Sequence, residues 1–277
     1  MKHGEGSFAG SENLPIYYQY WLPDGEPRAV IVISHGLAEH GGRYGNIIGR
    51  LVPPGFAVYA LDHRGHGRSE GLKGYVRRFS DFTDDLASFI KIVKEKHPDK
   101  KMFVFGHSIG GTIAAVYAAG DRPEVDGLIF SAAVMVPGKS VSPALVRLGR
   151  VLSRLTPGLG LYALETSAIS RDAAVVEAYR SDPLVYHGKT RVRLGMELIN
   201  AMERLRPQLD RIKLPVLILH GTDDRLSEPA GSDMLYDRAG SADKTYQRYE
   251  GFYHEVFNEP GKEQVLADIE SWLLDHV

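Results

Sequence analysis

The chain has 277 residues, 43% hydrophobic and 25% charged, which is typical of a globular protein. Its formal net charge of −2 offers no basic excess for nucleic acid, and the absence of cysteine excludes disulfides, zinc–thiolate sites and a cysteine nucleophile. No apolar stretch approaches the roughly 18 residues of a membrane span, and the first residues lack the apolar segment of a secretory signal. The cytoplasm is therefore the expected compartment, with peripheral membrane association left open, and composition does not predict an oligomeric state.

Apolar runs of strand length alternate with helical patterns along most of the chain. The expected strands are residues 15–22, 29–34, 56–61, 102–105, 127–132, 216–220 and 245–249. Residues 80–96, 112–119 and 262–274 carry the apolar periodicity of helices. Continuous apolar strands separated by helices indicate a mostly parallel sheet covered on both faces, so the predicted fold class is α/β.

The alternation stops between residues 136 and 206, where no segment has a convincing strand pattern. Three helices are expected there, over residues 143–155, 172–179 and 192–205, the first with Ser142 as N-cap. We expect residues 136–206 to form a helical cap over the strand ends. Residues 1–135 and 207–277 would form the core.

The first of these helices is amphipathic. Leucines recur at helical spacing and form one face, at Leu145, Leu148, Leu152 and Leu155. The opposite face is basic, with Arg147, Arg150 and Arg154. One interpretation places the leucines against the protein and leaves the arginines solvated. The other places the helix on a membrane or lipid surface, where it admits acyl chains. We prefer the first; both hold if the leucines line a substrate tunnel.

A serine stands at a strand-to-helix corner within the sequence G-H-S-I-G, residues 106–110. A serine between two glycines at such a corner is the nucleophile elbow of serine hydrolases. We therefore expect Ser108 in a strained backbone conformation, with Gly106 and Gly110 allowing neighbouring chains to pass close.

A serine nucleophile needs a base and a carboxylate, which follow it in the order serine, acid, histidine in this architecture. Asp223 and Asp224 come directly after the strand expected at 216–220, and either carboxylate fits this position. His254 follows the last strand and is the expected base. His220 lies inside an apolar strand, where a core role is expected, and His276 is next to the C-terminus.

The oxyanion formed at the substrate carbonyl needs two backbone N–H donors. Ile109, directly after the nucleophile, supplies one, and the loop after the strand at 29–34 supplies the other through Leu37. His35 and His40 in that loop are expected to shape it rather than bind a metal, because no third ligand stands at metal-site spacing. No metal or cofactor is expected.

Six short motifs, spread over essentially the whole chain, resemble those of one protein family. They are H-G-x-x-E-H at 35–40, D-H-R-G-H-G-R-S at 62–69, G-H-S-x-G-G at 106–111, S-D-P-L at 181–184, G-x-x-D-R-L at 221–226 and Y-E-G-x-Y-H at 249–254. With them the chain resembles the monoacylglycerol lipases of the α/β-hydrolase superfamily. The resemblance implies an α/β-hydrolase fold, hydrolysis of monoacylglycerol to fatty acid and glycerol, and Asp224 as the acid.

The resemblance also implies that Glu39, Arg43 and Tyr179 hold the glycerol end of the substrate. His107 is next to the nucleophile, and two roles are equally consistent with its position: it lines the pocket, or it only packs in the core. Relatives of the mammalian type carry a second histidine three residues after the catalytic one, where this chain has Phe257.

Three alternative functions remain open from the sequence. A broader carboxylesterase or a lysophospholipase would use the same triad. A peptidase acting on free N-termini would use an acidic side chain such as Glu39 for the amine. A non-catalytic ligand-binding protein would keep the fold alone, although the complete Ser108, Asp224 and His254 set disfavours it.

Overall fold

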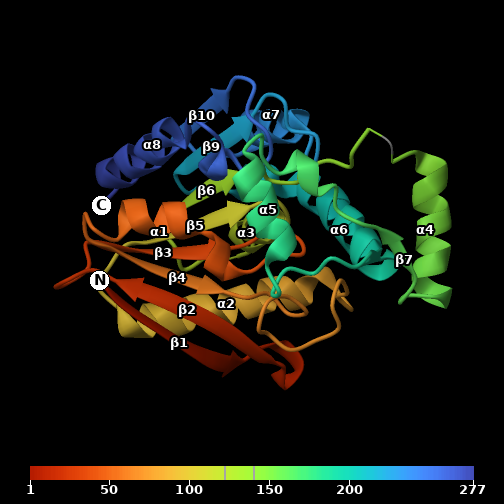
Figure 1. Cartoon of the computed structure of the whole chain (residues 1–277), viewed down its shortest axis with the longest axis horizontal. Coiled ribbons are helices and arrows are strands. Elements are labelled where there is room, and N and C mark those ends of the chain that lie inside the picture. Colours follow the sequence, from red (N-terminus) through yellow and green to blue (C-terminus); the bar gives the residue numbers. More distant parts are fainter. Residues whose placement is uncertain (122, 140) are drawn as a thin grey trace.

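The computed structural model describes residues 1–121, 123–139 and 141–277, and a single eight-stranded sheet organises them (Figure 1). The strands lie in the order β1-β2-β4-β3-β5-β6-β9-β10. Their bounds are β1 Lys2–Ala9, β2 Pro15–Leu22, β3 Ala29–Ser34, β4 Phe56–Leu61, β5 Met102–His107, β6 Gly127–Ser131, β9 Val216–Gly221 and β10 Lys244–Tyr249. The strands from β4 to β10 in this order are parallel, and β1 and β2 pair antiparallel at one edge. The predicted mostly parallel sheet is confirmed.

Helices cover both faces of the sheet and create two hydrophobic cores. The helices are α1 Gly45–Leu51, α2 Phe79–Lys96, α3 Ile109–Ala118, α4 Pro143–Leu155, α5 Ala173–Ser181, α6 Val192–Leu205, α7 Pro229–Arg238 and α8 Lys262–Asp275. Along β5 the side chains alternate: Met102 and Val104 join the core beneath α2 and α3, whereas Phe103 and Phe105 join the core beneath α1 and α8. Burial on both faces explains why β5 is apolar throughout.

The parallel strands place four loops at one edge of the sheet. The loops follow β3, β5, β9 and β10, and because these strands are parallel, their carboxyl ends meet on the same side. The loops after these strands carry Leu37, Ser108, Asp224 and His254, in that order.

The segment between β6 and β9 contributes no strand to this sheet within its described residues. It holds α4, α5 and α6, but it also contains β7 (Gly160–Tyr162) and β8 (Thr190–Arg191), which pair antiparallel. The expectation that no strand occurs there was therefore wrong, since two- and three-residue strands leave no periodic pattern to detect. In Figure 1, α4 stands at the edge of the molecule, with α6 between it and the sheet.

The leucine face of α4 points outward, contrary to the preferred interpretation of its sequence. Leu145, Leu148 and Leu155 are 50%, 53% and 74% exposed. The buried positions of the helix are Gly149 and Ser153. A Cβ atom at Gly149 would lie 2.6 Å from Sδ of Met196 on α6, so the small side of α4 packs inward. Close helix approach through small residues leaves the leucines to face away from the protein.

Candidate active site

Ser108 occupies a strained corner between β5 and α3. Its backbone has φ 54° and ψ −122°, a conformation that residues other than glycine rarely adopt. A Cβ atom at Gly106 would lie 2.7 Å from Cα of Gly111, and one at Gly110 would collide with the carbonyl oxygen of Ser34. The predicted strain at Ser108 and the predicted close approach at both glycines are confirmed.

The loops after β9 and β10 bring Asp224 and His254 together. Nδ1 of His254 lies 2.8 Å from Oδ2 of Asp224, and the carboxylate side chain is fully buried. Oδ1 accepts the backbone N–H groups of Leu226 and Ser227 at 2.8 and 3.0 Å. Asp223 is exposed instead, so of the two adjacent carboxylates only Asp224 reaches the imidazole.

The pair shifts the pKa of each partner in opposite directions. Burial raises the pKa of Asp224, but the charge of His254 and hydrogen bonds from His220 and His254 outweigh burial and hold it well below its usual range. Burial lowers the pKa of His254, and the Asp224 carboxylate overcomes this, so the pKa lies above 6.5. The acid thus stays ionised while the base binds a proton readily.

Ser108 and His254 line one cavity of about 20 Å³. Its other lining residues are Gly36, Leu37, Glu39, His107, Leu164, Ile169, Tyr179 and Glu255. Because Nδ1 of His254 is used by Asp224, Nε2 is the ring nitrogen left for the serine hydroxyl. The hydrogen bond between Ser108 and His254 stays a prediction.

The two expected oxyanion donors come from residues close to Ser108: Ile109 follows it in the chain, and Leu37 lines the same cavity. Ile109 is the first residue of α3, so its N–H has no acceptor within the helix. Leu37 lies in the loop after β3, which Glu39 shapes by accepting the N–H of Gly36 at 2.6 Å. Ala38, next to Leu37, has φ 66°, so this loop is a tight turn.

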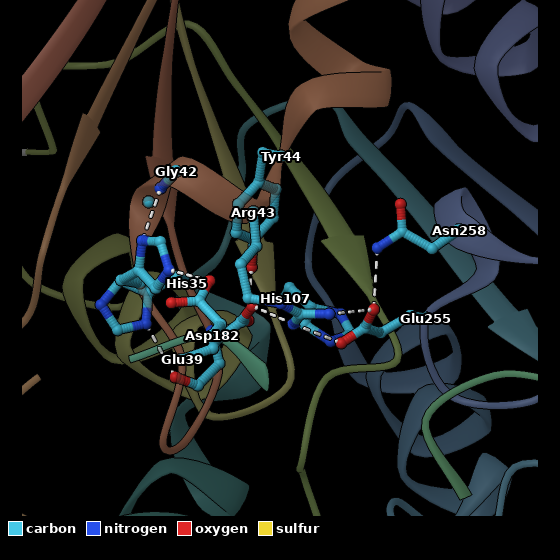
Figure 2. A network of polar contacts seen from close by, with 12 residues as sticks. His35, Glu39, Gly42, Arg43, Tyr44, His107, Asp182, Glu255 and Asn258 are labelled. Carbon is cyan, nitrogen blue, oxygen red and sulfur yellow. Dashed lines mark hydrogen bonds and ion pairs between the residues drawn. The ribbon is translucent and has the colours of Figure 1, made fainter. Parts of the chain in front are cut away.

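Arg43 lies between the buried carboxylates of Glu39 and Glu255, both of which line the cavity (Figure 2). Nη1 donates to Glu39 at 2.7 Å and to Glu255 at 2.6 Å, and Nη2 donates to Glu255 at 3.0 Å. The guanidinium also lies 4.5 Å from the ring centroid of Tyr179. Glu39 and Arg43 therefore bind each other. The family resemblance implied that both hold glycerol, and any contact with glycerol would form while this ion pair is present.

The two carboxylates around Arg43 differ in their protonation behaviour. Burial raises the pKa of Glu39, and Arg43 only partly offsets it. Burial also raises the pKa of Glu255, but Arg43 and a hydrogen bond from Asn258 at 2.7 Å lower it below its ordinary value. Glu255 holds the negative charge more firmly than Glu39. Glu255 was not predicted from the sequence as a residue of the site, although its position directly after His254 could have indicated it.

His107 and Phe257 pack around the base. The His107 ring lies 4.7 Å from that of His254 and 5.1 Å from that of Phe257, and Nδ1 is 3.0 Å from the carbonyl oxygen of Ser131. His107 thus lines the cavity and fills space at once. No group of three or more histidine or acidic side chains in the described ranges has the arrangement of a metal site.

The sheet order, the strained serine after β5 and the carboxylate–imidazole pair after β9 and β10 match the arrangement of an α/β-hydrolase. A family model described as serine aminopeptidase, S33, matches residues 25–261. A monoacylglycerol lipase of Mycolicibacterium smegmatis is 41% identical over 99% of this chain and 98% of its own, and a monoglyceride lipase of Rattus norvegicus is 36% identical over 93% and 86%. The crystal structure of a Paleococcus ferrophilus monoacylglycerol lipase superposes with a TM-score of 0.84, at 34% identity, over 100% of both chains.

The chain belongs to the monoacylglycerol lipase family of the α/β-hydrolases and is a carboxylic ester hydrolase. The fold and family predicted from its motifs are confirmed.

Proposed function

We propose that the protein hydrolyses monoacylglycerols to fatty acid and glycerol through an acyl-enzyme on Ser108. The observation that carries this is the buried Asp224–His254 pair in contact with the cavity that Ser108 lines. His254 takes the proton of Ser108 as the hydroxyl attacks the ester carbonyl, and then returns that proton to the departing glycerol oxygen. A water deprotonated by His254 next attacks the acyl-enzyme, and His254 returns that proton to Oγ of Ser108 as the bond to the acyl group breaks and the fatty acid leaves. Asp224 fixes the ring so that Nε2 does this work.

Backbone N–H groups of Leu37 and Ile109 stabilise the oxyanion in both steps. Two observations support this: Ile109 is the first residue of α3, and Leu37 lines the cavity that Ser108 lines. Removing one donor from such a pair typically costs about 100-fold to 1,000-fold in kcat.

Charge at the cavity favours an uncharged glycerol over a phosphate headgroup. Two carboxylates, Glu39 and Glu255, line the cavity, and among its described lining residues there is no lysine or arginine. Arg43 already binds both carboxylates. A lysophospholipid would therefore place its phosphate against negative charge. The peptidase alternative is disfavoured too, since Glu39 is occupied by Arg43, Tyr44 and the N–H of Gly36.

Tyr179 supplies the hydroxyl group that is free to meet glycerol. Its Oη is buried and has no hydrogen-bond partner among the described residues, yet the side chain lines the cavity. A buried polar group without a partner is costly, and a substrate hydroxyl would remove that cost.

The test is turnover of monoacylglycerol, diacylglycerol, lysophospholipid and short nitrophenyl esters by the wild type and by Tyr179→Phe. We expect monoacylglycerol to be preferred. Tyr179→Phe should raise KM for monoacylglycerol roughly tenfold, the loss of about one hydrogen bond, and leave nitrophenyl ester turnover unchanged. Preference for lysophospholipid would contradict the proposed substrate.

We further propose that residues 136–206 act as a cap on a core of residues 1–135 and 207–277, and that α4 rests on lipid. None of the helices in the described ranges is long and apolar enough to span a membrane. The exposed side chains Leu145, Leu148 and Leu155 instead form an outward apolar face, flanked by arginines that suit anionic headgroups. A lipid surface is where monoacylglycerols reside, so this face would bring the cavity to its substrate.

Flotation with vesicles of phosphatidylcholine and phosphatidylserine tests the lipid contact. Leu145→Ser combined with Leu148→Ser should reduce vesicle binding severalfold without changing turnover of a soluble ester. The control is Leu274→Ser, because Leu274 is 39% exposed and belongs to α8, a helix on the opposite side of the molecule from α4 (Figure 1). Equal binding by both variants would rule out α4 as the contact.

A further inference from the structure

A second buried histidine contacts the acid of the triad. Nε2 of His220, near the end of β9, lies 3.1 Å from Oδ2 of Asp224. This is the same oxygen that accepts the Nδ1–H of His254 at 2.8 Å and that lies 2.8 Å from the hydroxyl of Ser227, so His220 is one of three groups around Oδ2. The side chains of His220 and Asp224 are 1% and 0% exposed, so solvent does not compete for either contact. The mechanism above uses no property of His220.

The hydrogen-bond pattern identifies which nitrogen of His220 carries the proton. An ionised carboxylate only accepts hydrogen bonds, so Nε2 must be the donor to Asp224. Nδ1 lies 2.7 Å from Oγ of Ser232 on α7, and that hydroxyl can donate to it. The ring is therefore held at both nitrogens. A continuous chain of hydrogen bonds leads from α7 through His220 and Asp224 to His254.

The hydrogen bond from His220 has two physical consequences for the carboxylate, beyond what the His254 ring and the Ser227 hydroxyl provide. It fixes the orientation of Oδ2, just as the N–H groups of Leu226 and Ser227 fix Oδ1. It also withdraws negative charge from Oδ2, so the carboxylate raises the basicity of His254 less than it would with one imidazole partner. A base whose pKa is too high is protonated, and therefore inactive, at neutral pH.

We propose that His220 is a positioning residue of the triad, which holds Oδ2 of Asp224 toward His254 and limits how strongly that carboxylate raises the basicity of His254. The proposal rests on the proposed function, since it takes Asp224 and His254 as acid and base. It goes beyond it by giving the buried histidine of β9 a part in setting the pH range of catalysis.

The pH profile of kcat/KM for a soluble nitrophenyl ester tests this proposal. His254 must be neutral to act, so activity falls as pH drops through its pKa, which lies above 6.5. The other titratable groups facing His254 are Glu255, Glu39 and His107, and they remain in every variant. His220→Phe removes the donor and should move the acid limb to higher pH by roughly half a unit to one unit.

The matched control is His220→Gln, whose side-chain amide can place an N–H where Nε2 of the histidine stood. It should keep the acid limb of the wild type. An acid limb that stays in place in His220→Phe, while activity falls equally in both variants, would show a packing role only and overturn the proposal.

A measurement on the wild type keeps the proposal testable if His220→Phe does not fold. Nuclear magnetic resonance of the protein labelled with ¹⁵N-histidine should show His220 protonated at Nε2 and unprotonated at Nδ1. A proton on Nδ1 instead would overturn the proposal. Failure of the triad itself is distinguishable, because Ser108→Ala would then keep its activity whatever the variants of His220 do.

Discussion

Arg43 is the residue on which the charge balance of the cavity depends. It is the shared partner of Glu39 and Glu255, and the three side chains are 9%, 3% and 3% exposed. Removing the guanidinium leaves two carboxylates buried without a counter-charge, and loss of one member of such a buried network costs about 3–5 kcal/mol. Arg43→Met should lower the free energy of unfolding in urea by that amount.

The control for this prediction is Arg50→Met, because Arg50 also pairs with a glutamate, Glu270, but is 43% exposed. Solvent screens that pair, so its loss should cost between zero and about 1 kcal/mol. Equal losses for the two variants would show that the Arg43 network is no more important to stability than a surface ion pair.

Single residues were predictable where chemistry imposes an order along the chain. Ser108, the Asp223–Asp224 pair and His254 follow from the order of nucleophile, acid and base, and motif resemblance favoured Asp224. Contacts among these residues were not predictable in the same way. His220 was expected in the core and is buried there. Its hydrogen bond to Asp224 depends on how the His220 side chain is oriented, which the sequence pattern does not predict.

At the scale of elements, residues 182–186, which we call the arm, lie between β6 and β9 and contact the loop after β3. Nδ1 of His40 accepts the N–H of Gly42, so Nε2 donates to Asp182 at 2.9 Å. The N–H of Tyr186 donates to the carbonyl oxygen of Ala38 at 2.8 Å. Because Ala38 is next to Leu37, we expect these contacts to hold the proposed oxyanion donor in position.

Loosening this arm should therefore slow the chemical step. Asp182→Ala is expected to lower kcat for a soluble ester about tenfold, since small displacements of a catalytic donor have effects of this order. Asp172→Ala is the matched control. Asp172 caps α5 in the same segment by accepting the N–H of Ala174 at 2.9 Å, and its loss should cost about 1 kcal/mol of stability. Stopped-flow acylation rates that are equal in both variants would contradict the link.

The sequence predicted the elements with strong apolar periodicity and missed those without it. The strands from β2 to β10 in the large sheet are within two residues of their expected bounds, but β1 was not expected. Its sequence K-H-G-E-G-S-F-A has few apolar residues because it is an edge strand. Gly4 and Gly6 lie against the rings of Tyr20 and Tyr18, where a Cβ atom would collide, so tertiary packing rather than propensity selects the glycines.

At the scale of the whole molecule, the cavity is too small for the substrate that we propose. A volume of about 20 Å³ holds roughly one water molecule, whereas binding sites for small molecules occupy about 300–1,000 Å³. Leu164, Ile169 and Tyr179 close it from the segment between β6 and β9. We therefore expect that segment to move when an acyl chain enters.

Hydrogen exchange of two covalent adducts of Ser108 measures this movement. A long-chain alkylphosphonate adduct should increase exchange in residues 164–181 severalfold relative to a methylphosphonate adduct. Amides of β3 and β5, which lie in the centre of the sheet, should exchange equally in the two adducts. Identical exchange in residues 164–181 would show that the acyl chain enters by another route.

The central claim is that Ser108 is the nucleophile of a monoacylglycerol hydrolase, and one measurement tests it most directly. Wild type and Ser108→Ala are assayed for release of fatty acid from a monoacylglycerol chain-length series, and each is then treated with a fluorophosphonate and examined by intact mass. We predict turnover and one added phosphonyl group in the wild type, with neither in Ser108→Ala, although both proteins have the same unfolding midpoint. Retained hydrolysis by Ser108→Ala would contradict the account.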